Sequence, residues 1–211
     1  MTKNSFFHFP ARQPDEAHRS STPLELMFDL ASVIAIAAAA HGLAHAVEEA
    51  HVVQGVIGFV CSFFMIWLAW MNYTWFASAY DDDSTAFRVL TMIIMFGALM
   101  LAAGIGAVFE QQRIWLALFG FIIMRLGMAV FWLGAARADP EHRKTALRYA
   151  KGIVVMQLYW IAVVVLTPPT SAIYLPLFFV GVAGELAVPA IAERQGATTW
   201  HRHHMIERYG L

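Results

Sequence analysis

Residues 114–136 read IWLALFGFIIMRLGMAVFWLGAA, and this stretch decides the fold. It is long enough to cross a bilayer, which takes about 20 mostly apolar residues, and its single charge is Arg125. A guanidinium keeps its proton inside a protein. At lipid depth it therefore needs a buried acidic partner, a water-filled cavity or a route to the surface. The stretch predicts a transmembrane helix with a polar centre near its middle.

Five further apolar segments of similar character accompany this one. The 211-residue chain is 59% hydrophobic and 14% charged, whereas soluble domains carry about 45–50% apolar and about 25% charged residues. The predicted spans are residues 24–47, 52–77, 89–109, 114–136, 152–167 and 172–192. None alternates with a period of two, which argues against a transmembrane barrel. The predicted fold class is all-α, a polytopic six-span transmembrane helix bundle.

The distribution of Lys and Arg predicts the orientation of the bundle. If both ends lie inside, twelve of the fourteen basic residues face the cytoplasm, Arg113 faces outward and Arg125 is embedded. Loops rich in Lys and Arg stay cytoplasmic. We therefore expect a cytoplasmic N-terminal tail at residues 1–23, a six-helix domain at residues 24–193 and a cytoplasmic tail at residues 194–211.

Composition narrows the partners and also suggests how the helices pack. A net charge of −1 gives no reason to expect nucleic acid binding, and the single cysteine, Cys61, falls inside the second span. The first and third spans are rich in small residues, so we expect them to be inner helices. Several aromatic residues are expected to lie at headgroup level, namely Trp67, Trp70, Tyr73, Trp75, Trp115 and Trp132.

The start of the first span combines a capping signal with two acidic residues. Thr22, Pro23 and Glu25 form a capping box, with Thr at the N-cap and Pro at the first helical position. This explains Glu25 structurally and leaves a functional role open. Asp29 lies one turn deeper on the same face, about 8–9 Å into the span.

Four charged residues are expected in the cytoplasmic half of the bundle: Asp29, Arg88, Arg125 and Glu185. Two interpretations remain open. In the first, the charges pair with one another and lock the helices together. In the second, Asp29 or Glu185 is a site for a cation or proton, and Arg125 tunes it. Either way, Glu25, Asp29, Arg88, Arg125 and Glu185 are the candidate residues for binding an ion or substrate.

A weaker candidate is a metal site at the far end of the first span. His41, His45 and Glu48 share a helix face, and two histidines one turn apart with a carboxylate can hold a divalent metal. They can equally pass protons or sense pH. The chain shows no phosphate-binding glycine loop, nucleophile elbow or metalloprotease motif. We predict no catalytic residue and no cofactor.

Three landmarks give the chain a family resemblance. Residues 21–30 read STPLELMFDL, residues 80–83 read YDDD and are followed by Phe87 and Arg88, and residues 203–211 read HHMIERYGL. Together they resemble the bacterial low temperature requirement A family along the whole chain. The resemblance implies a bacterial inner-membrane protein linked to growth in the cold, and it brings no agreed activity.

The resemblance also implies a longer protein. Family members are roughly twice this length, with a second set of spans after the Glu-Arg-Tyr-Gly-Leu motif, so the tail at residues 194–211 is expected to lead into a missing second half. Glu25 and Glu207 would each begin a span approached from the cytoplasm, as in a parallel repeat. The expected partners are the lipid bilayer, a small ion or solute, and a second six-span half or another copy of the chain.

The leading functional hypothesis is movement of a small ion or solute through the polar site. The first alternative is a membrane-embedded enzyme acting on a lipid-linked substrate, because the basic fourth loop could hold anionic headgroups. The second alternative is a membrane factor without turnover.

Overall fold

A computed structural model describes residues 22–80, 84–198 and 206. It contains six helices that are long and apolar enough to cross a membrane, which confirms the predicted all-α class and the number of spans. The N-terminal tail, Asp81 to Asp83 and nearly all of the C-terminal HHMIERYGL landmark lie outside the described residues.

The helices follow one another with short connections. Their bounds are α1 Pro23–Glu48, α2 Val52–Ala79, α3 Thr85–Gly104, α4 Gly106–Phe109, α5 Trp115–Ala138, α6 Arg143–Leu166 and α7 Tyr174–Ala192, followed by the 3₁₀ turn η1 Glu193–Gln195. The single-turn α4 continues the span of α3 after a break at Ile105. The end of the bundle that carries α4 is called the α4 end below, and the opposite end is called the Thr22 end.

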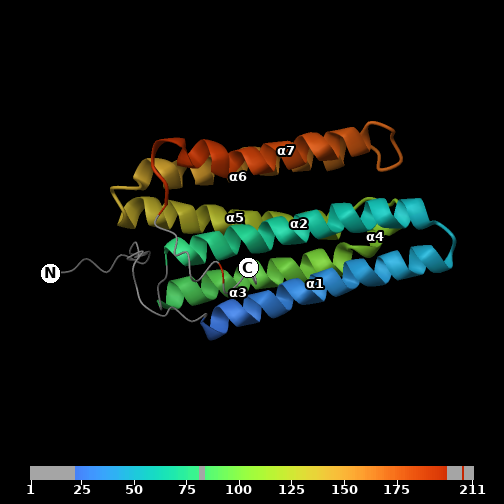
Figure 1. Cartoon of the computed structure of the whole chain (residues 1–211), viewed down its shortest axis with the longest axis horizontal. Helices are drawn as coiled ribbons and strands as arrows, with labels where there is room; N and C mark the ends of the chain where they lie inside the picture. Colours follow the sequence, from blue (N-terminus) through green and yellow to red (C-terminus); the bar gives the residue numbers. More distant parts are fainter. Residues whose placement is uncertain (1–21, 81–83, 199–205, 207–211) are drawn as a thin grey trace.

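The long helices form three layers. Figure 1 shows α6 and α7 in one layer, α2 and α5 in the middle and α1 and α3 in the third. The main packing partners are α1 with α2 and α3, α3 with α5, α5 with α6, and α6 with α7. Along this series of contacts, α2 and α7 are the two ends. In Figure 1 the middle layer of α2 and α5 lies between α7 and the layer of α1 and α3.

Local sequence signals set the starts of α1 and α3. The Thr22 hydroxyl accepts a hydrogen bond from the Glu25 backbone N–H at 3.2 Å, and Pro23 occupies the first helical position. Ser84 caps α3 in the same way by accepting from the Phe87 N–H at 3.2 Å. These caps satisfy donors that a helix start leaves without an intrahelical partner.

The expectation about inner helices holds only in part. Among the six spans α5 is the most buried, whereas α1 shares the lowest buried fraction with α7. Several alanines of α1 face outward, so its small residues do not mark it as central. In α3 the expectation fits better, because Gly97 and Gly104 lie directly against the backbone of α5.

Two other expectations need correction. Helix α6 starts at Arg143, not at residue 152. Its first two turns carry exposed cations on one side and bury Ala146, Tyr149 and Ala150 on the other, so the helix continues beyond lipid depth. Tyr73 and Trp132 are fully buried inside the bundle, so they do not face the lipid as interface anchors would. Trp132 stacks on Tyr149 with ring centroids 4.0 Å apart.

Candidate functional site

The candidate site is a buried polar centre where α5, α6 and α7 meet. A terminal guanidinium nitrogen of Arg125, Nη2, donates to Glu185 Oε2 at 2.5 Å, and both side chains are 1% exposed. Arg125 was expected to meet Asp29 or Glu185, and the structure gives it Glu185. The pair joins α5 to α7, two helices that both pack on α6.

Helix α6 contributes a hydrogen bond to the same carboxylate. Trp160 Nε1 donates to Glu185 Oε1 at 3.0 Å, so each oxygen of the carboxylate has a donor. The Phe121 ring lies with its centroid 5.8 Å from the guanidinium carbon of Arg125. An aromatic face at this distance stabilises a cation. The ion pair is thus enclosed by two aromatic side chains.

Polar atoms remain without partners beside the pair. Arg125 Nε and Nη1, together with both amide atoms of Gln157, are buried and have no hydrogen-bond partner among the described residues. Gln157 is 3% exposed and lies one turn from Trp160 on the same face of α6. An unpaired buried polar group costs about 1–3 kcal/mol. Such groups mark the centre as a place where a polar solute could be received.

Helices α5, α6 and α7 place Arg125, Gln157 and Glu185 at similar depths. At 1.5 Å per residue, Arg125, Gln157 and Glu185 all lie about 13–17 Å from the α4 end of their own helices. That is near the middle of a hydrocarbon core about 30 Å thick. The polar centre therefore lies at lipid mid-depth.

The other sequence candidates lie elsewhere. Asp29 Oδ1 accepts a hydrogen bond from Trp70 Nε1 of α2 at 2.6 Å. Glu25 is buried in the first turn of α1, and Arg88 lies on the exposed side of the first turn of α3. Of the other four candidates, the structure therefore places Glu185 beside Arg125. The predicted charged residues do not form one site around Arg125.

The proposed metal ligands lie on the exposed end of α1. His45 Nε2 is 3.4 Å from a Glu49 carboxylate oxygen, and His45 Nδ1 is 4.0 Å from Glu48, with all three side chains more than half exposed. His41 is exposed as well. Within the described part of the chain, no three His, Cys, Asp or Glu side chains are grouped to hold a metal ion.

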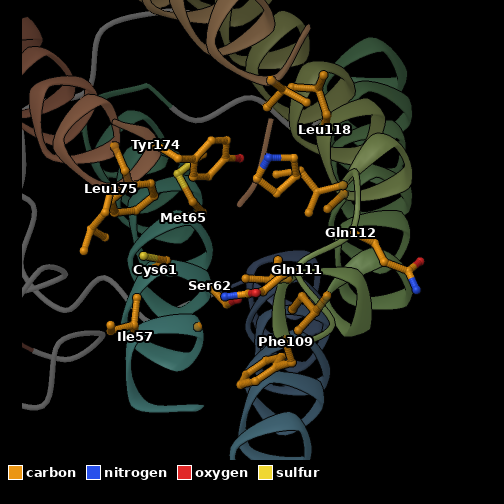
Figure 2. Close-up of a pocket in the computed structure, with 18 of the residues that line it drawn as sticks. Ile57, Cys61, Ser62, Met65, Phe109, Gln111, Gln112, Leu118, Tyr174 and Leu175 are labelled. Carbon is orange, nitrogen blue, oxygen red and sulfur yellow. The ribbon is translucent and has the colours of Figure 1, made fainter. Parts of the chain in front are cut away.

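A cavity of about 400 Å³ adjoins the polar centre on its α4 side. Its walls come from α2, α3, α4, α5, α6 and α7, and they include both Phe121 and Trp160. Figure 2 shows Ile57, Cys61 and Met65 along α2 and Tyr174 and Leu175 on α7. The same two aromatic residues thus touch the ion pair and line the cavity.

Sequence analysis missed Gln157, Trp160 and the cavity. A signal was present for the first two, because a Gln and a Trp three residues apart occupy the interior of the sixth helix in chain order, α6, where apolar residues are the rule. No comparable signal exists for the cavity. Its residues come from six helices and two loops, and only their arrangement in space reveals it.

A second polar cluster ties the helices together at the Thr22 end. Asp139 Oδ1 accepts from the backbone N–H groups of Glu141 and His142, and Oδ2 accepts from the Tyr80 hydroxyl at 3.1 Å. Burial raises the pKa of Asp139, but the hydrogen bonds from His142 and Tyr80 outweigh burial and leave the pKa below its usual value. Burial, with the nearby Asp139 charge, raises the pKa of Tyr80. This cluster orders the turn between α5 and α6.

Comparisons with known proteins identify one family. The family model described as bacterial low temperature requirement A protein matches residues 20–211. Neither the curated proteins nor the solved structures yield a match.

Proposed function

The chain belongs to the bacterial low temperature requirement A family, and on that premise we propose that it moves a small ion or solute across the membrane through the Arg125–Glu185 centre. The membrane location follows from the family and from six helices of spanning length. One observation carries the proposal. A fully buried ion pair at mid-depth has donors beside it that find no partner among residues 22–80, 84–198 and 206.

The energetics support this proposal over a purely structural ion pair. Burying two charges costs several kcal/mol per ion, and their attraction recovers this only when the remaining polar atoms are satisfied. Here two guanidinium nitrogens and a complete amide group find no hydrogen-bond partner in the part of the chain that the structure describes. A clamp that served stability alone would be better built from apolar residues.

The surplus of donors indicates the chemistry of the solute. Arg125 contributes Nε and Nη1, and Gln157 adds its amide nitrogen. All three donate hydrogen bonds. A passing solute that carries an acceptor oxygen, or an anion, is therefore suited to this centre.

The orientation belongs to the same proposal. The basic residues described at the Thr22 end are Arg88, Arg137, Arg143, Lys144, Arg148, Lys151 and Arg194. At the α4 end the described basic residue is Arg113. By the positive-inside rule the Thr22 end faces the cytoplasm of a bacterial inner membrane, and the cavity faces the other side.

Flux through proteoliposomes tests the proposal. We expect the wild type to pass at least one of the probes K⁺, Na⁺, Cl⁻, protons and acetate. Arg125→Met and Glu185→Gln should abolish that flux. Arg137→Met is the matched control, because it removes an exposed arginine from the same helix and should leave flux unchanged.

A paired variant separates transport from folding. Either single substitution leaves the partner's charge buried without a counter-charge, which costs about 3–5 kcal/mol. Combining Arg125→Met with Glu185→Leu removes both charges and should restore thermal stability. We expect the double variant to fold and still pass no probe. Restored flux in the double variant, or a wild type that moves none of the probes, would contradict the proposal.

A further inference from the structure

We propose that the cavity at the α4 end is a binding site for a small, uncharged, largely apolar organic molecule that carries one hydroxyl or carbonyl group. The cavity adjoins the polar centre, but its lining does not include Arg125, Gln157 or Glu185, and the inference holds whether or not the protein transports an ion. Its size suits such a ligand, because pockets for small molecules measure about 300–1,000 Å³ and this one holds about 400 Å³.

The lining sets the charge of the ligand. The 25 residues around the cavity include no Asp, Glu, Lys, Arg or His. Moving an unpaired charge into such surroundings costs far more than moving a neutral group. An ionised molecule would therefore bind poorly, whereas the apolar surfaces of Phe109, Phe121 and Phe178 suit a flat apolar body.

Hydroxyl groups supply the polar recognition. The Ser62 hydroxyl lines the cavity, is buried and has no hydrogen-bond partner among the described residues. It lies about 15 Å along α2 from Val52, at about the depth of the polar centre. In Figure 2 the Tyr174 hydroxyl points into the space between α7 and α5. A hydroxyl both donates and accepts, so either one can pair with a ligand hydroxyl or carbonyl.

Three glutamines form part of the cavity's rim at the α4 end of the bundle. Gln54, Gln111 and Gln112 line the cavity and are exposed at the α4 end. Uncharged amides at this rim and an apolar interior match a molecule of mixed character. A lipid acyl chain, which has no group for these amides or for Ser62, is the competing occupant.

The native thiol of Cys61 reports occupancy, because it lines the cavity and is the single cysteine of the chain. The probes are 1-naphthol, which is uncharged at neutral pH, and 1-naphthoate, which has the same ring system and a charge. At ten times its dissociation constant, 1-naphthol should slow maleimide modification of Cys61 about tenfold. The same concentration of 1-naphthoate should leave the rate unchanged.

Variants of α2 tie the effect to the cavity. Ile57→Trp fills the space one turn from Cys61 and should abolish direct binding of 1-naphthol by the protein in nanodiscs. Val56→Trp adds the same side chain at an exposed neighbouring position outside the lining and should bind normally. Ser62→Ala should weaken 1-naphthol about two- to tenfold and leave naphthalene unchanged.

Three results would overturn the assignment. The first is equal protection of Cys61 by 1-naphthol and 1-naphthoate. The second is equal binding by the Ile57→Trp and Val56→Trp variants. The third is a thiol that is shielded by phospholipid and opened by delipidation without any response to 1-naphthol, which would make lipid the occupant.

Discussion

At the scale of the residue, the chemistry of Arg125 was predictable and its surroundings were not. A permanently charged side chain in an apolar span must find an acid, and the structure supplies Glu185. The choice of Glu185 over Asp29 depends on which helices adjoin α5, and one sequence does not contain that information. The roles of Trp160 and Gln157 depend on the same unknown.

The Trp160–Glu185 hydrogen bond can be tested by removing the indole N–H. Trp160→Phe should lower the free energy of unfolding by about 1.5–3 kcal/mol, because the acceptor is a buried carboxylate. The measurement is thermal unfolding in detergent micelles. Trp115→Phe, at an exposed position on α5, should change stability by less than about 0.5 kcal/mol. Equal effects from the two substitutions would show that this hydrogen bond does not matter.

At the scale of the element, apolar length fixed where the helices are, and caps fixed two of their starts. Thr22 and Pro23 signal the beginning of α1, and the structure places it there. The start of α6 escaped prediction because Arg143 to Lys151 look like a loop when charge alone is considered. Ala146, Tyr149 and Ala150 are buried on one side of this segment. Their three- and four-residue spacing is that of a helix face.

Glycine contacts between α3 and α5 give a prediction about packing. A Cβ at Gly120 would overlap the Leu101 backbone nitrogen and the Gly97 carbonyl oxygen, and backbone atoms cannot move aside like a flexible side chain. Gly120→Ala should therefore destabilise the protein by about 1–3 kcal/mol. Gly106→Ala is the control, since its Cβ would meet nothing within 4 Å. Thermal unfolding of the two variants should separate them clearly.

The turn between α5 and α6 gives a prediction about pH. The pKa of Asp139 is lower in the folded protein than its unfolded value of about 3.9. Its contribution to stability is therefore present above about pH 4 and is lost as the pH falls through the folded value. Asp139→Asn should be less stable at pH 7 and should lose less stability on acidification.

Unfolding midpoints between pH 7 and pH 3 provide the measurement for Asp139. Glu141→Gln, an exposed change in the same turn, should follow the wild-type profile. If the wild type and Asp139→Asn lose stability in parallel across that range, the hydrogen bonds at Asp139 do not act through its ionisation.

At the scale of the whole molecule, the length and position of the apolar segments were sufficient to predict six spans, and the structure contains six helices of spanning length. Hydropathy works here because each span must satisfy its own backbone hydrogen bonds in lipid. The packing order of the helices was not predictable, because small residues occur on the outside of α1 as well as between α3 and α5. The cavity depends on that order and so escaped prediction as well.

The orientation of the bundle is testable in intact cells. With Cys61→Ala as background, Glu49→Cys lies between α1 and α2 at the α4 end, and Glu141→Cys lies between α5 and α6 at the Thr22 end. A membrane-impermeant maleimide should label the first variant directly and the second only after the membrane is permeabilised. The reverse pattern would invert the assigned orientation.

Trp160 connects the cavity with the Arg125–Glu185 centre. Its ring borders the cavity, and its N–H holds Glu185. A molecule that displaces the indole also changes the hydrogen bonding of the Arg125 counter-ion. Because thermodynamic linkage is reciprocal, if such a molecule changed the affinity of Glu185 for a proton or solute by some factor, that proton or solute would change the affinity of the cavity for the molecule by the same factor. The Trp160 indole is thus the side chain through which a ligand in the cavity would act on the ion pair at the centre of the bundle.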